Sequence, residues 1–296
     1  MNLKQLINFK QLRCFHAVAR EGGFTMAARA LSVGQPSITT HIKSLEDSNG
    51  VELFSRHGHI VELTDIGCSL LAITKRIFSL EKEAAELLDA ASGLKIGNLK
   101  ISAIGPFQVT EMILAFGQKF PDVELSVSFG NSQEVLDGLF DFTGDVAVLA
   151  RVKDDHRLFS IPYGDYQVVI LAGNDHPWGQ RKEINIEELD GQRMIFREVG
   201  SATRRVFEKK LEESGVSIRR VLEIGSREAM IQAVARGIGI GIALEEEISM
   251  DKRLKSIKVT NADITLHSQV VCLQERRNSP LIKAFLSVVK DLIAIR

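Results

Sequence analysis

One long segment, residues 64–91, constrains this chain more than any other part of it. Its apolar side chains recur at alternating spacings of four and three residues, at Ile66, Leu70, Ile73, Ile77, Leu80, Ala84, Leu87 and Ala91. This repeat is typical of a coiled-coil seam, and a long helix with such a seam needs a partner to cover it. We therefore predict a dimerisation helix over residues 65–93, with an ordinary core helix as the alternative. The expected dimer contacts are Ile66, Leu70, Ile73, Ile77, Leu80 and Leu87.

The segment before this helix, residues 1–64, predicts three short helices and a hairpin. The first helix stops at Gly22-Gly23, and an alanine-rich second helix follows over Phe24–Leu31. In the tight turn Ser32-Val33-Gly34 we expect Gly34 to take a left-handed conformation. Pro36 then fits the first turn of a third helix, because its missing N–H would be unpaired there. Two short helices joined by such a turn predict a helix-turn-helix.

The third helix presents polar side chains outward, because Ile38, Ile42 and Leu45 form its buried face. Small hydroxyls, amides and a lysine on the other faces suit base edges and phosphates in a major groove of DNA. The next residues, 51–64, are two apolar runs around Arg56-His57-Gly58-His59, which predicts a wing hairpin with a cationic tip. The predicted DNA contacts are Thr25, Gln35, Pro36, Ser37, Thr39, Thr40, Lys43, Arg56 and His57. The alternative is a helical domain whose third helix packs on a partner protein.

After Gly97 the pattern changes to strands that alternate with helices. The predicted strands are Leu99–Ile104, Val123–Phe129, Val146–Ala150, Tyr166–Ala172, Met194–Phe196, Ile218–Ile224 and Val270–Leu273. The predicted helices are Val109–Phe120, Gln133–Phe140, Ser201–Glu213, Arg227–Arg236 and Pro280–Ile293. Such alternation is typical of a mainly parallel sheet covered by helices, so we expect an α/β domain over residues 94–296.

Residues 1–91 resemble the N-terminal part of a LysR-type transcriptional regulator, and the similarity continues through the rest of the chain. The matching segments are Phe9–Phe15, Gly23–Leu31, Gln35–Glu46, Leu53–Arg56 and Leu63–Gly67. Their order and spacing together are highly specific. The resemblance implies an α/β chain with a winged helix-turn-helix (1–64), a linker helix (65–93) and a two-lobed effector domain like a periplasmic binding protein (94–296). It places lobe 1 at about 97–163 and 268–296, lobe 2 at about 164–267, and the crossovers near Pro162–Tyr166 and Thr265–Gln269.

The resemblance also implies a function: a cytoplasmic, sequence-specific transcription factor controlled by a small metabolite bound between the lobes. Its expected partners are double-stranded operator DNA, the metabolite, RNA polymerase and further copies of the chain, as a homodimer and then a homotetramer. Ligand closure would shift the relative placement of the DNA-binding pairs. No membrane partner is expected.

Four strand-to-helix junctions offer free backbone N–H groups and the positive end of a helix dipole, which favour an anion. Ligands in such sheets lie beyond the carboxyl ends of strands. The predicted effector contacts are Gly105, Pro106, Phe107, Gln108, Asn131, Ser132, Ser201, Ala202, Thr203, Arg204, Ser226 and Arg227. The effector is therefore expected to carry a carboxylate, sulfate, phosphate or phosphonate group. At any single junction the alternative is a purely structural role, because a serine before a helix often only caps it.

Composition and motifs exclude several other classes. Lys+Arg 37 nearly cancels Asp+Glu 38, and the start lacks the long apolar core of a signal peptide. Three widely spaced cysteines make a disulfide scaffold or a zinc site improbable, and we expect Cys14 and Cys68 to be buried. Because no GxSxG, HExxH or GxxxxGK[ST] motif occurs, we expect no enzyme, cofactor or metal. The competing class is a cytoplasmic solute-binding sensor that acts through protein partners.

Overall fold

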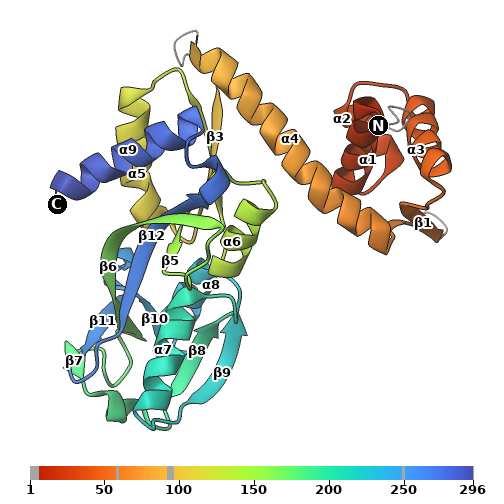
Figure 1. Ribbon diagram of the computed structural model, residues 1–296. Helices are drawn as coiled ribbons and strands as arrows, with labels where there is room; N and C mark the ends of the chain where they lie inside the picture. The colour runs from red at the N-terminus through yellow and green to blue at the C-terminus, as the bar shows by residue number, and fades with distance from the viewer. Residues whose placement is uncertain (1–6, 58–59, 92–96, 249–250, 296) are drawn as a thin grey trace. The chain divides into compact units, whose positions relative to one another are not determined.

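The computed structural model describes residues 7–57, 60–91, 97–248 and 251–295. The chain divides into two compact units, Met1–Ala85 and Glu86–Arg296 (Figure 1). The first unit holds the helix-turn-helix and most of the long helix. The second unit holds the two α/β lobes.

The first unit is built on three helices and a hairpin, as the sequence predicts. The elements are α1 (Phe9–Glu21), α2 (Phe24–Ala30), α3 (Gln35–Asn49), β1 (Phe54–His57) and β2 (Ile60–Leu63). Their shared core includes Phe15, Val18, Ala27, Ile38, Ile42, Leu45 and Leu53, all buried. Strands β1 and β2 pair antiparallel, so the wing hairpin forms around residues 58–59, which lie outside the described part. The side chains of Arg56 and His57 belong to the same tip and are likewise outside the description.

The turn between α2 and α3 corrects one expectation. Gly34 has φ −71° and ψ 140°, an extended conformation before the first turn of α3, so it is not the left-handed residue. Ser32 takes that conformation instead, with φ 54°. The cause is the way α2 ends: the N–H groups of Ser32 and Val33 donate to the carbonyls of Arg29 and Ala28, which requires a left-handed residue just after the C-cap residue Leu31.

The long helix α4 spans Asp65–Ala91, and its predicted stop at Ser92-Gly93 falls outside the described residues. Thr64 precedes it, and the Thr64 hydroxyl accepts a hydrogen bond from Gly67 N at 3.0 Å. Gly67 itself is required, because a Cβ there would lie 2.2 Å from the carbonyl oxygen of Leu53. The start of α4 is thus fixed against the wing.

Lobe 1 is a sheet covered on both faces. Its elements are β3 (Asn98–Ala103), α5 (Pro106–Lys119), β4 (Glu124–Phe129), α6 (Ser132–Phe140), β5 (Val146–Ala150) and α9 (Pro280–Ile295). Successive residues of β5 point to opposite faces. Val146 and Val148 pack in the cluster that holds α5 and α9, whereas Ala147 and Leu149 pack with α6.

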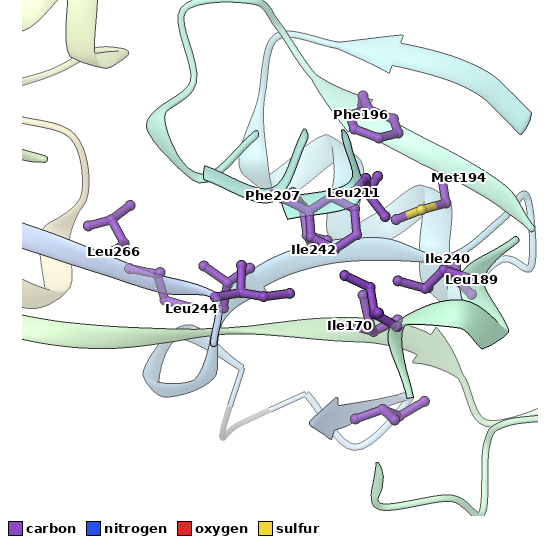
Figure 2. Packing of buried hydrophobic residues seen from close by; sticks show 14 of the residues in the cluster. Ile170, Leu189, Met194, Phe196, Phe207, Leu211, Ile240, Ile242, Leu244 and Leu266 are labelled. Carbon is purple, nitrogen blue, oxygen red and sulfur yellow. The ribbon is translucent and has the colours of Figure 1, made fainter. Parts of the chain in front are cut away.

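Lobe 2 repeats this arrangement. Its helices are α7 (Ala202–Glu213) and α8 (Arg227–Ala235), and its strands include β7 (Glu183–Ile184), β8 (Arg193–Arg197), β9 (Arg219–Ile224), β10 (Gly241–Leu244) and β11 (Leu254–Val259). Short 3-10 turns occur at Ile186–Leu189, Glu245–Glu247 (η3) and Gln274–Arg276. Figure 2 shows the apolar core beneath α7, where Phe207 and Leu211 of that helix lie near Met194 and Ile242. The opposite face packs against α8 through Met230 and Val234.

Two strands join the lobes and lie side by side: β6 (Leu158–Gly173) and β12 (Thr265–Leu273). They pair antiparallel from Thr265 with Gln167 to Leu273 with Leu158. The path β4-β3-β5-β12-β6-β11-β7 is therefore continuous through both lobes, with β10 also pairing β6. The sheet is mixed rather than mainly parallel, because these crossing strands run antiparallel to their neighbours. The sequence pattern predicted only the second half of β6, and it did not predict β7 or β11.

Candidate DNA-binding surface and effector cleft

Helix α3 carries an exposed polar surface. Gln35, Ser37, Thr40 and Lys43 are exposed, as are Pro36 and the nearby Thr25, while Thr39 is half-buried. Several of these side chains are held in place locally. The Thr25 hydroxyl donates to Gln35 Oε1 at 3.2 Å, and the Thr40 hydroxyl donates to the carbonyl of Pro36 at 2.9 Å. The surface is thus formed by side chains that are solvated yet partly preorganised.

The side chain of Glu46 links α3 to the wing hairpin by hydrogen bonds. One carboxylate oxygen, Glu46 Oε1, accepts from Leu53 N at 2.8 Å and from Phe54 N at 3.3 Å. Backbone N–H groups at the start of β1 are therefore bonded to a side chain of α3. These bonds hold the start of the hairpin beside α3, where a wing can touch DNA next to the helix.

The predicted seam on α4 divides into two rows. Leu70 and Ile77 are partly buried against the core of their own unit, together with Leu71 and Phe78. The other row stays exposed: Ile66 by 52%, Ile73 by 55%, Leu80 by 59% and Leu87 by 61%. These four positions repeat every seven residues. They form an apolar stripe that the described chain leaves uncovered.

In the second unit the four predicted junctions converge in pairs. Within lobe 1, Gly130 N donates to the carbonyl of Ala103 at 3.1 Å, which brings the start of α6 beside the start of α5. Between the lobes, a Cβ on Gly200 would lie 2.6 Å from the side chain of Asn131. Arg227 Nη2 donates to the carbonyl of Ile104 at 3.1 Å. We call these four junctions together the effector cleft, after the function proposed for them below.

Arg227 places a positive charge at these junctions. Its side chain is only 18% exposed and forms an ion pair of 3.1 Å with Glu247 in η3, whose side chain is 7% exposed. Burial raises the pKa of Glu247, and the nearby Arg227 offsets part of that effect. A Cβ on Gly105 would meet Arg227 Nη1 at 2.9 Å, so a glycine there lets the guanidinium approach lobe 1. Sequence reasoning missed Glu247, whose contact crosses from η3 to α8.

Two buried side chains at the starts of α5 and α6 have polar atoms without partners. Gln108 is 2% exposed and Ser132 is 5% exposed. Among the described residues, no group hydrogen-bonds to either amide atom of Gln108 or to the hydroxyl of Ser132. Buried polar atoms are nearly always hydrogen-bonded, so these atoms mark a place where another polar group belongs. Pro106 and Phe107, next to Gln108, are exposed.

At the start of α7, the hydroxyl of Ser201 and the guanidinium of Arg204 are already bonded within the protein. Ser201 is buried and its hydroxyl accepts from Arg204 N at 3.4 Å, as a helix cap. Ala202 is buried and Thr203 is half-buried. The Arg204 guanidinium is committed elsewhere: it donates to the carbonyl of Arg197 and to the carboxylates of Glu208 and Glu223. Ser226 caps α8 by accepting from Ala229 N at 3.2 Å.

The prediction that both Cys14 and Cys68 are buried is only half right. Cys14 is buried as expected, but Cys68 is exposed, because it lies on a face of α4 that the core of its unit does not cover. Burial raises the pKa of the third thiol, Cys272, to about 12. Within the described ranges, no three His, Cys, Asp or Glu side chains gather as a metal site. Every helix in that part of the chain is too short or too polar to span a bilayer.

The fold and these two sites define a two-part regulator: a winged helix-turn-helix joined to a two-lobed ligand-binding domain. The family model described as "Bacterial regulatory helix-turn-helix protein, lysR family" matches residues 9–68, and "LysR substrate binding domain" matches residues 92–294. The chain therefore belongs to the LysR family. It is a DNA-binding transcriptional regulator with an effector-binding domain, and not an enzyme.

Individual relatives agree with this assignment. The HTH-type transcriptional activator CmpR of Synechocystis sp. is 32% identical over 234 residues, which cover 78% of this chain and 77% of that protein. Full-length OxyR from Pseudomonas aeruginosa has the same fold, with a TM-score of 0.77, 21% identity and coverage of 97% and 95%. The regulatory domain of Synechocystis CcmR in complex with 2-PG gives a TM-score of 0.61 at 24% identity, covering 67% of this chain and 97% of that chain.

Proposed function

We propose that the effector of this regulator is a small anionic metabolite held in the effector cleft. The observation that carries the proposal is the place of Arg227. It is a largely buried cation at the N-terminus of α8, where the helix dipole also favours negative charge, and it reaches across to Ile104 of the other lobe. An anion bound beside it would contact both lobes.

Other residues of the cleft support the same ligand chemistry. The amide of Gln108 and the hydroxyl of Ser132 are buried donors without partners in the described structure, and both lie at helix N-termini. Ser201 and Thr203 would contribute from α7, with Gly105, Asn131 and Ser226 at the other helix starts. We leave Arg204 out, because its guanidinium donates to two carboxylates and to the carbonyl of Arg197, whereas Arg227 is paired with one carboxylate, Glu247. The binding of 2-PG by the regulatory domain of CcmR is consistent with a small ligand for this fold.

We infer that α3 enters a major groove, with Gln35, Ser37, Thr39, Thr40 and Lys43 as its main contacts. Their exposure on one short helix supports this placement. Thr25 and Pro36 would lie beside them, and Arg56 and His57 would reach the DNA backbone from the wing. Phosphate contacts would position the unit, and contacts to base edges would give it sequence specificity.

We propose that protomers pair through the exposed row of α4, Ile66, Ile73, Leu80 and Leu87. A seven-residue repeat of large apolar side chains is the pattern that a coiled-coil partner covers. Two DNA-binding units would then meet two half-sites, and the effector domains would join dimers into a tetramer. The assembly would act in the cytoplasm, where lobe closure would alter its contact with DNA and with RNA polymerase.

Titration calorimetry tests the effector proposal. The full chain is titrated with a panel of small carboxylates, sulfates, phosphates and phosphonates, with 2-PG among them. The compound that binds is then titrated into Arg227→Gln. We expect affinity to fall about tenfold or more, because a charge-assisted hydrogen bond in a buried site is lost. Arg236→Gln is the matched control, because Arg236 is an exposed arginine at the other end of the same helix.

Two further variants locate the ligand. Ser201→Ala and Thr203→Ala remove hydroxyl groups from α7, and each should weaken binding. Undiminished affinity in Arg227→Gln, Ser201→Ala and Thr203→Ala together would contradict the placement of the ligand in the effector cleft.

A further inference from the structure

The carboxylate paired with Arg227 is buried and weakly hydrogen-bonded. Glu247 lies in η3, and its side chain is 7% exposed. Its Oε1 lies 3.1 Å from Arg227 Nη2, yet within the described chain that oxygen accepts no well-aligned hydrogen bond. The bond that Oε2 accepts, from Leu244 N, is long at 3.4 Å. The negative charge of Glu247 therefore depends mainly on the positive charge of Arg227.

The charged groups that act on Glu247 come from three elements. Arg227 of α8 has the largest effect, followed by Arg197 of β8, and both favour the ionised carboxylate. Glu246, beside it in η3, opposes them. Arg197 is itself bonded to Glu198, with its Nε 2.8 Å from that carboxylate. Burial raises the pKa of Glu247, and the two arginines offset only part of that effect. A proton is thus the alternative to a cation for keeping this carboxylate in the interior.

The guanidinium of Arg227 has to serve several acceptors. Its Nη2 also donates to the carbonyl of Ile104 at 3.1 Å, and the proposed function places an anion beside the same group. That anion adds a negative charge to a buried pair whose own charges cancel. Burying a net charge is costly, and an ionisable group in such a place neutralises instead. Glu247 shares the guanidinium with the anion, so Glu247 is the group whose protonation should change.

We propose that Glu247 is a positioning residue of the effector site and that binding of the effector anion is coupled to uptake of one proton at its carboxylate. This inference rests on the anion site proposed above and adds its regulation by pH. Without ligand, the ionised carboxylate holds the guanidinium of Arg227 in place. When an anion shares the guanidinium, a proton from the solvent forms an O–H bond on Glu247. For a monoanion the net charge of the buried groups then stays at zero.

Titration calorimetry of the full chain in buffers of different ionisation enthalpy measures this coupling. The probes are sulfate, oxalate and lactate, whose charges do not change between about pH 6 and 8 because their acids titrate at lower pH. The slope of the observed enthalpy against the ionisation enthalpy of the buffer gives the number of protons taken up. We expect about 0.5–1 proton per anion at pH 7, and an affinity that rises by up to about tenfold for each unit by which the pH falls.

Glu247→Gln separates this role from a merely structural one. The variant keeps the size of the side chain and removes the titrating group, so binding should take up no proton and should not depend on pH. Glu212→Gln is the matched control, because Glu212 is an exposed carboxylate of α7 in the same lobe, and it should take up protons like the unaltered chain. Glu246→Gln should also retain the uptake, although Glu246 Oε2 is buried without a hydrogen-bond partner among the described residues.

The outcomes distinguish the coupling from the anion site itself. Saturable binding without proton uptake, or uptake that persists in Glu247→Gln, would overturn the coupling and leave the proposed function intact. Uptake lost in Glu246→Gln and retained in Glu247→Gln would place the proton on Glu246 and would also overturn it. Absence of saturable binding by all three probes would contradict the anion site, and the coupling with it.

A second measurement needs no ligand. Arg227→Gln removes the cation, so the folded chain should bind a proton at Glu247 at a higher pH than the unfolded chain does. The stability that this proton contributes is fully present below the ordinary pKa of a glutamate and is lost as the pH rises through the raised pKa. Urea unfolding between pH 5 and 8 should therefore show Arg227→Gln losing stability toward high pH, relative to the unaltered chain. Adding Glu247→Gln should remove this dependence, and a profile of Arg227→Gln parallel to that of the unaltered chain would overturn the proposal.

Discussion

Helix α3 and the effector cleft use polar side chains in opposite ways. On α3 the polar groups are exposed, and local bonds such as Thr40 to the carbonyl of Pro36 hold some of them in place. In the cleft, Gln108 and Ser132 are buried, and the described structure offers their polar atoms no partner. Exposed polar side chains on a DNA-binding surface cost the folded chain little stability, because water solvates them before DNA binds. A site that encloses a small ligand has to bury polar atoms before the ligand arrives.

This difference predicts how a substitution at each kind of position changes binding affinity and folding stability. Removing a side chain from α3 should alter DNA binding and leave folding unchanged. Removing an unpartnered polar group from the cleft should weaken ligand binding and stabilise the fold. A third kind of position, buried and paired, should show the largest loss of stability of all.

The buried pair Asp145–Arg276 gives that largest expected effect. Both side chains are 4% exposed, with Arg276 Nη1 at 2.7 Å from Asp145 Oδ1. Arg276→Met leaves a buried carboxylate without its cation, so the free energy of unfolding should fall by about 3–5 kcal/mol. Thermal unfolding of the full chain followed by circular dichroism measures this. Arg277→Met, at the exposed neighbouring arginine, is the control. An equal loss of unfolding free energy in both variants would contradict the expectation that the buried pair matters most.

Gln35→Ala tests the exposed side of the comparison. The amide of Gln35 is held by Thr25 and suits the edge of an adenine. Affinity for the best operator fragment should fall by about 1–3 kcal/mol, with no change in melting temperature. Fluorescence anisotropy at fixed salt measures the affinity. Ser48→Ala, near the C-terminal end of α3, should bind DNA normally; a matching loss there would show that α3 is merely disturbed.

A smaller effect concerns pH and the packing of α1 on α4. His16 Nδ1 lies 3.1 Å from Thr74 Oγ1, and burial, with the charges of Arg20 and Lys75, lowers the pKa of His16. The unfolded chain therefore takes up this proton near the ordinary value of about 6.5, and the folded chain only at lower pH. The stability of the first unit should be fully present above pH 6.5 and decline as the pH falls through the lowered pKa. Urea unfolding between pH 5.5 and 7.5 checks this, and His16→Gln should flatten the profile in that range.

Local sequence signals predicted much of the secondary structure of this protein. Glycines at helix ends and Pro36 predicted the helix-turn-helix, and serines before helices predicted the capped starts of α7 and α8. The seven-residue repeat of α4 was also visible. Which of its rows faces outward was not visible, because both rows are apolar and only packing against the core of the first unit buries Leu70 and Ile77.

What escaped prediction depends on contacts between distant segments. Glu247 pairs with Arg227 from a turn that no local pattern distinguishes. Arg204 looked like a ligand for an anion, and the structure instead places Glu208 and Glu223 around it. Non-local pairing decided each of these positions.

The most direct test of the account is one variant measured in two ways. Gln108→Leu replaces a buried amide, which has no hydrogen-bond partner among the described residues, with an apolar group of similar size. We expect the free energy of unfolding without ligand to rise by about 1–3 kcal/mol, and the affinity for the anion identified by calorimetry to fall. A variant that is less stable and binds the anion as tightly as the unaltered chain would contradict the claim that the cleft buries its polar groups for a ligand.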